Sequence, residues 1–213
     1  MLSSPLYLLR DNPLLFVAFV LAVIVAITFH EFSHAAAGTL QGDDTAKSQG
    51  RLTLNPLSHL DPLGSIFLIV GGFGWGRPTP YNPARLRNQR VGTVLVALAG
   101  PTSNFLLAIA SAVALRVALS AGSDASSFTV NLLLIFIQFN VLLGIFNLLP
   151  IPPLDGSRLL TVFLPPSRHG IVDFLDRYGI FLLLGLLILA PGLLTPFVAE
   201  LVRAILGLVG LPY

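Results

Sequence analysis

The sequence predicts an all-α polytopic membrane protein of about five transmembrane helices, with a three-helix core and a short membrane-associated β-hairpin or re-entrant loop. Hydrophobic residues make up 54% of the 213 residues and charged residues only 10%, whereas ordinary soluble domains are about 25% charged. The apolar runs are long enough to cross a hydrocarbon core of about 30 Å. A net charge of +2 is too small to indicate nucleic acid as a partner. We expect one membrane-embedded domain over residues 1–213, with its core at 13–156 and C-terminal helices at 171–210.

The first predicted span covers residues 13–40. Asn12 followed by Pro13 is a typical helix start, because asparagine caps the first free N–H groups and proline suits the first helical position. A helix of this length is about 42 Å long, so its last turns extend beyond the hydrocarbon core. We expect no cleavable signal peptide, because no small-residue cleavage pattern follows the first apolar run.

Near the end of this span lies the sequence His30-Glu31-Phe32-Ser33-His34. Side chains four residues apart lie on one face of a helix, so His30 and His34 can ligate one metal ion. Glu31 is rotated about 100° away, which suits contact with a metal-bound water. This is the H-E-x-x-H pattern of zinc proteases. The chain has no cysteine, so any metal site must use nitrogen and oxygen ligands.

The connection at 41–90 is rich in glycine and proline and carries six Lys or Arg residues. Its apolar part at 64–75 is too short and too glycine-rich for a spanning helix, and we interpret it as the hairpin or re-entrant loop. Further spans are predicted at 91–119 (interrupted by Ala99-Gly100-Pro101 and bearing Asn104), 128–149, 171–190 and 195–210.

The loop charges predict an orientation. The first connection has six Lys or Arg, the second at 120–127 has none, and the third has three, which places the first and third in the cytoplasm. The first helix then brings its histidines to the same membrane level as Asp155. A catalytic zinc typically has three protein ligands, and spacing alone leaves Asp155 and Asp61 as rivals for the third. His59 could be a ligand, a substrate contact or an interfacial histidine.

Three motifs resemble the site-2 protease family of intramembrane zinc metalloproteases, in its minimal prokaryotic branch without PDZ or CBS domain. They are His30 to His34, Ala99-Gly100-Pro101 with Asn104, and Asn147-Leu148-Leu149-Pro150 through Leu154-Asp155-Gly156. The stretches Gly50 to Pro56 and His59 to Pro62 also look similar to that branch.

The resemblance implies roles for individual residues. It makes Asp155 the third zinc ligand, Glu31 the general base and Asn147 a stabiliser of the oxyanion on the scissile carbonyl. Asn104 matches a recurrent polar position of the second core helix, and we predict that it contacts substrate, as does His59. The region around Gly74 and Trp75 looks like the β-hairpin that presents an edge to an unwound substrate by strand addition.

The expected function is hydrolysis of a peptide bond in or near a transmembrane helix of a single-span membrane substrate, close to the cytoplasmic face. The expected cofactor is Zn²⁺, and the expected location is the lipid bilayer of a prokaryotic cytoplasmic membrane. Two alternatives use the same ligands: a zinc or proton transporter, and a zinc-bound but inactive relative that only binds helices. The single acidic residue at 120–127, Asp124, argues against a polar path to the far side. An intact Glu31 argues against inactivity.

Overall fold

The computed structural model describes residues 5–165, 168–190 and 192–211, and over these residues the regular secondary structure is helical, apart from one isolated antiparallel bridge. In chain order its helices are α1 (Pro5–Asp11), α2 (Pro13–Leu40), α3 (Thr45–Ser48), η1 (Pro56–Ser58), α4 (Pro62–Gly71), η2 (Pro83–Arg85), α5 (Gln89–Ser120), α6 (Phe128–Asn147), α7 (Asp155–Phe163), α8 (His169–Leu189) and α9 (Thr195–Leu208).

Three of the described helices, α2, α5 and α6, are long and apolar enough to cross a membrane. Each begins at a capping side chain: the side-chain oxygens of Asn12, Asn88 and Ser127 accept a hydrogen bond from a backbone N–H three residues on. Such caps satisfy backbone groups that would otherwise be unpaired at a helix start. The all-α membrane fold and its three-helix core are therefore confirmed, with the first helix at the predicted bounds.

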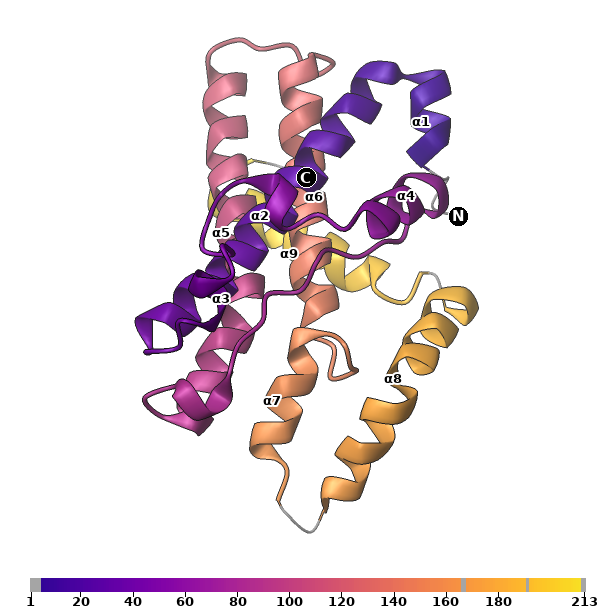
Figure 1. Cartoon of the computed structure of the whole chain (residues 1–213). Coiled ribbons are helices and arrows are strands. Elements are labelled where there is room, and N and C mark those ends of the chain that lie inside the picture. The colour runs from indigo at the N-terminus through magenta and orange to yellow at the C-terminus, as the bar shows by residue number, and fades with distance from the viewer. Residues whose placement is uncertain (1–4, 166–167, 191, 212–213) are drawn as a thin grey trace.

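The three spans pack directly on one another. In Figure 1, α5 and α6 run side by side and α2 crosses them, and these three pairs make the most extensive contacts between elements. The buried faces are rich in small residues, including Ala22 and Ala26 of α2 and Ala97, Gly100 and Ala108 of α5. Small side chains let helix backbones approach closely in a membrane, where helix association depends on packing.

The C-terminal helices differ in how they join this core. α9 buries Val202, Ile205 and Leu206 against α5 and α6, and Arg116 of α5 donates to the carbonyl of Val209 at 2.6 Å. α8 stands apart from the bundle (Figure 1), although Gly179 packs against Pro152 so closely that a Cβ there would lie 2.6 Å from the Pro152 carbonyl oxygen.

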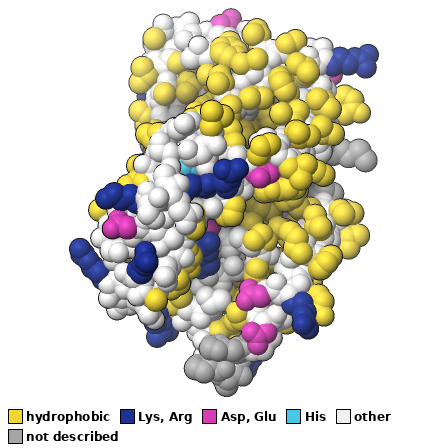
Figure 2. Space-filling model, in the orientation of Figure 1, with side chains coloured by type: hydrophobic (Ala, Val, Ile, Leu, Met, Phe, Trp, Pro, Cys, Tyr) yellow, Lys and Arg dark blue, Asp and Glu magenta, His cyan; other side chains and the backbone are white. Residues whose placement is uncertain are grey.

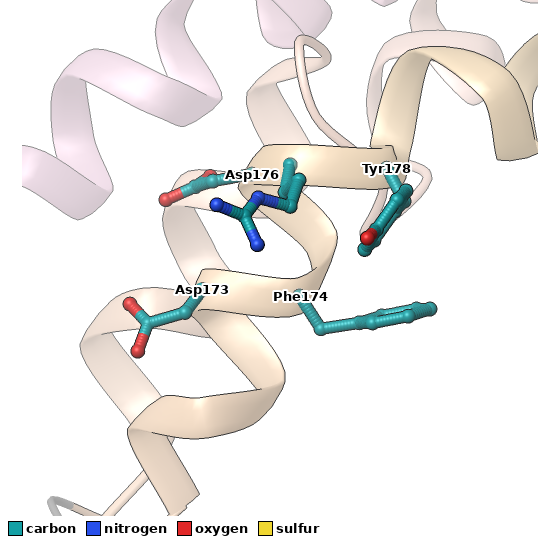
Figure 3. Close-up of a pocket in the computed structure, with 5 residues that line it drawn as sticks. Asp173, Phe174, Asp176 and Tyr178 are labelled. Carbon is teal, nitrogen blue, oxygen red and sulfur yellow. The ribbon is translucent and has the colours of Figure 1, made fainter.

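Helices thus form where the fourth and fifth spans are predicted, yet neither is long and apolar enough to count as a span. α8 carries charged residues in its first half, and α9 has only 14 residues, about 21 Å. The count of five spans stays a prediction. One side of α8 holds a shallow hollow (Figure 3) lined by Asp173, Phe174, Asp176, Arg177 and Tyr178, which includes none of the predicted site residues.

The predicted β-hairpin at 64–75 is not confirmed. Most of this stretch is the ten-residue helix α4, after which the chain returns in an extended segment that makes one bridge, between Leu60 and Gly76. Local signals explain the helix: the Asp61 carboxylate caps the Gly64 N–H at 2.8 Å, proline occupies the first position, and Gly72 ends the helix at φ 75°, a conformation suited to glycine.

The third connection also differs from the prediction of a basic loop. A nine-residue helix, α7, begins at Asp155 itself and includes Arg158. Most Lys and Arg side chains visible in Figure 2 gather over the half of the molecule that contains α3, η2 and α7, while hydrophobic side chains cover most of the rest of that face.

Candidate metal centre

Two histidines of α2 and the first residue of α7 meet in the interior of the three-helix core. The Nε2 atoms of His30 and His34 are 3.0 Å apart, and each lies 3.1 Å from Oδ2 of Asp155. All three side chains are buried. Among the described residues this is the one group of three or more His, Asp or Glu side chains that could hold a metal ion.

The tertiary structure brings one of the two rival aspartates next to the histidines. Asp61 caps α4 and does not belong to the group, whereas Asp155 does. A carboxylate binds a metal in its ionised form.

The Nδ1 atom of each histidine, on the opposite side of the ring from the metal-binding Nε2, faces a hydrogen-bond acceptor of α5. His34 Nδ1 lies 2.6 Å from the backbone carbonyl of Val96, and His30 Nδ1 lies 2.7 Å from Oδ1 of Asn104. Because these oxygens only accept, each Nδ1 must carry the proton, which leaves the Nε2 lone pairs free for a metal. Such hydrogen bonds to the far ring nitrogen are a regular feature of metal-binding histidines.

Gly100 lines the space between the ligands. A Cβ at this position would lie 2.4 Å from His34 Nε2 and 2.7 Å from His30 Nε2, so any other residue would intrude on the ligand atoms. A point about 2 Å from all three ligand atoms, the usual zinc distance, is compatible with separations of 3.0 to 3.1 Å. The two imidazoles and the carboxylate are ligands that suit zinc, and the lack of a side chain at Gly100 leaves room for the ion.

Glu31 lies beside this group without belonging to it. Its Oε2 accepts the backbone N–H of Thr79 at 2.8 Å, and the Thr79 hydroxyl donates to the Glu31 carbonyl at 3.1 Å. Residues 76–80, which we call the strap, therefore run past the metal centre. Arg77 and Thr79 each precede a proline, which favours an extended backbone, and Pro78 and Pro80 have no N–H. Oε1 accepts no hydrogen bond from the strap.

The strap is anchored at several points on the connection. The Arg77 N–H donates to the carbonyl of His59 at 2.7 Å, and the buried Arg51 guanidinium donates to the carbonyl of Arg77. Beyond the strap, Asp43 Oδ2 accepts the N–H of Asn82 at 2.6 Å, and the Arg158 guanidinium lies 4.5 Å above the Tyr81 ring.

The remaining predicted site residues take different positions. Asn104 is fully buried behind His30, and His59 is fully buried with its Nε2 at 2.7 Å from the Thr53 carbonyl. Asn147 is partly buried and donates to Leu143 of its own helix at 3.0 Å. Trp75 is 44% exposed and lies against Phe67, and a Cβ at Gly74 would lie 2.1 Å from the Gly64 carbonyl oxygen.

Sequence reasoning missed three contributors to the site. The sequence carries a weak signal for Thr79: it lies between two prolines, so it has the one backbone N–H of Pro78-Thr79-Pro80. Asn140, a polar residue in an apolar helix, contacts Asn104. Val96 acts through its backbone carbonyl, which leaves no trace in residue identity.

Comparison with known proteins agrees with this geometry. Residues 116–186 match peptidase family M50. A Bacillus subtilis protein, YwhC, is 42% identical over 177 residues, which cover 81% of each chain. Rip2 of Mycobacterium tuberculosis is 33% identical over 183 residues, 84% of this chain and 69% of that protein. Both are named as candidate zinc metalloproteases. No solved structure matches.

A shorter match joins 81 residues, 36% of this chain and 36% of the relative, at 38% identity to the protease RseP of Photorhabdus luminescens. These relatives point to Zn²⁺ as the cofactor, and the buried His30, His34 and Asp155 supply ligands suited to it. With its apolar spanning helices, a buried group of two histidines and an aspartate that could hold a metal ion, and similarity to zinc metalloproteases over most of its length, this integral membrane protein belongs to peptidase family M50, the site-2 proteases.

Proposed function

We propose that this chain is an intramembrane zinc metalloprotease that cleaves a single-span membrane protein in or near its transmembrane helix, close to the cytoplasmic face. The observation that carries the proposal is the buried group of His30, His34 and Asp155 with Glu31 next to it. His30 is the eighteenth residue of α2, about 15 Å before the end of that helix, so the reaction would take place at membrane depth.

In this proposal His30, His34 and Asp155 hold the zinc. A zinc ion bound there would polarise the scissile carbonyl and lower the pKa of its water towards ~7. Glu31 takes the proton of the attacking water and returns it to the leaving amine. The Thr79 N–H on Oε2 fixes the carboxylate, so Oε1 is the oxygen that exchanges the proton.

Asn147 is proposed to stabilise the oxyanion. Its amide has two N–H groups, and the Leu143 carbonyl takes one of them, which leaves the second for the substrate. The extended segment around Gly74 and Trp75 is proposed to receive an unwound substrate as an added strand. The exposed Trp75 ring and the surrounding phenylalanines would pack on the apolar side chains of such a substrate.

The orientation rests on loop charge. Five Lys or Arg lie in the connection after α2 and a sixth in the first turn of α5, whereas the short turn between α5 and α6 has none, which favours a cytoplasmic position for the connection. Water would then reach the zinc through the polar connection. We expect cleavage nearer that face, and we place the protein in a prokaryotic cytoplasmic membrane.

The test uses purified full-length protein and a single-span substrate reconstituted in liposomes. Glu31→Gln should keep stoichiometric zinc and lose about 10²- to 10⁴-fold in cleavage rate, the usual contribution of a general base. Asp155→Ala should lose the zinc. Cleavage by Glu31→Gln at the wild-type rate would contradict the role of Glu31. Zinc flux into sealed vesicles without any cleavage would instead support a transporter.

A further inference from the structure

A chain of two fully buried amides connects His30 to the third span. Asn104 of α5 and Asn140 of α6 are both 0% exposed. Asn104 Nδ2 donates to Oδ1 of Asn140 at 3.0 Å and to the Ala26 carbonyl of α2 at 3.3 Å. Asn140 Nδ2 in turn donates to the Phe136 carbonyl at 2.9 Å. The chain therefore joins all three core helices.

The orientation of the Asn104 amide decides which nitrogen of His30 can bind metal. Both N–H groups of Asn104 are taken by oxygen acceptors, so only its Oδ1 can face His30 Nδ1. That oxygen requires a proton on Nδ1. If the amide flipped, its NH₂ group would face Nδ1 and favour the tautomer with the proton on Nε2, which blocks the metal-binding lone pair.

Asn140 fixes that orientation by the same logic. Its own NH₂ donates to the Phe136 carbonyl, so its Oδ1 is the atom that faces Asn104. Without an acceptor at position 140, one N–H of Asn104 would be buried and unpaired, which costs about 1 to 3 kcal/mol. The preference for the productive amide orientation would fall accordingly.

We propose that Asn140 is a positioning residue of the metal centre: it orients the Asn104 amide, and through it the His30 imidazole, in the form that binds zinc. The proposal rests on the proposed zinc protease function. It goes beyond the packing role that amides often play between membrane helices, because this chain of hydrogen bonds ends at His30 and both N–H groups of Asn104 have a defined acceptor.

The test measures zinc affinity of the full-length protein in detergent by competition with a chromogenic chelator. Asn140→Leu keeps a similar volume but removes the acceptor, and we expect zinc affinity to fall about 10- to 100-fold, as for other residues behind metal ligands. Asn140→Asp is the conservative variant. Burial favours its protonated form, which can accept from Asn104 and donate to Phe136, so affinity should stay near that of the wild type.

Gln138→Leu is the matched control, because Gln138 is an exposed amide of the same helix and its loss should leave zinc affinity unchanged. If Asn140→Leu does not fold by circular dichroism, Asn140→Ala takes its place. Wild-type affinity in the apolar variant, or an equal loss in Gln138→Leu or Asn140→Asp, would overturn the proposal. If wild-type protein binds zinc but cleaves no substrate, the proposed function fails while the affinity comparison still decides the role of Asn140.

Discussion

The three-helix core and the connection between α2 and α5 hold the same site in different ways. In the core, helix packing fixes the ligands, and both Nδ1 atoms of the histidines have partners. In the connection, Thr79 of the extended strap makes two hydrogen bonds with Glu31, and Arg77 of the strap is anchored by single hydrogen bonds with Arg51 and His59. Two buried side-chain nitrogens there, Arg51 Nε and His59 Nδ1, have no hydrogen-bond partner.

This difference separates two functions. Contacts in the core should determine the zinc affinity, whereas contacts in the connection should determine the turnover of the zinc-loaded protein. Changes in the core are therefore expected to remove the metal, and changes in the connection to lower turnover with the metal retained. The following predictions test that division, beginning with the largest effect.

Gly100→Ala should abolish zinc binding in the core. Its Cβ would lie 2.4 Å from His34 Nε2, and neither the ring nor the α5 backbone can yield without moving a ligand. We expect zinc content after desalting to fall close to zero, measured by elemental analysis. Gly185→Ala on α8 is the matched control, because no atom lies within 4 Å of its added Cβ. Full zinc content in Gly100→Ala would show that the ligands are held less rigidly than described.

Arg51→Met should affect the connection alone. It removes the donor to the Arg77 carbonyl and the positive charge that interacts with Glu31, so the strap holds the general base less firmly. We expect cleavage of a single-span substrate to fall about 10-fold, of the order of one lost charged hydrogen bond, with zinc content unchanged. Arg87→Met, at an exposed arginine of the same connection, should cleave normally. Loss of zinc in Arg51→Met would contradict the division between the two regions.

Asp43→Asn should give the smallest effect, on the stability of the connection. Burial raises the pKa of Asp43, but hydrogen bonds from Thr45 and Asn82 and the charge of Arg85 outweigh it and lower the pKa. The carboxylate therefore stabilises the fold above its unfolded pKa of about 4, and this contribution is lost as the pH falls through the lower folded value.

In the wild type, limited proteolysis within the connection should become faster as the pH falls below about 4. The amide that replaces the carboxylate in the variant cannot ionise, so we expect a loss of about 1 to 3 kcal/mol at pH 7 and a weaker dependence on acid. Asp44→Asn is the control, because Asp44 forms only an exposed ion pair with Lys47 at 3.9 Å, which contributes little. Equal behaviour of the two variants would refute the role given to Asp43.

The sequence by itself determined the elements and half of the metal site. Helical spacing placed His30 and His34 on one face, the capping Asn12 located the start of α2, and apolar runs located α2, α5 and α6, because these signals are local to each segment. Two short helices were not predicted: α4, which the Asp61 cap and Gly72 delimit, and α7, which begins within a predicted loop.

Only the tertiary structure decided how these elements combine. Spacing could not choose between Asp155 and Asp61, since the ligand that meets His34 lies 121 residues away. The same holds for the Val96 carbonyl, the Thr79 N–H and the space at Gly100. These contributions come from backbone atoms and from an absent side chain. Their position depends on how three helices and a strap pack together, which no single segment of sequence specifies.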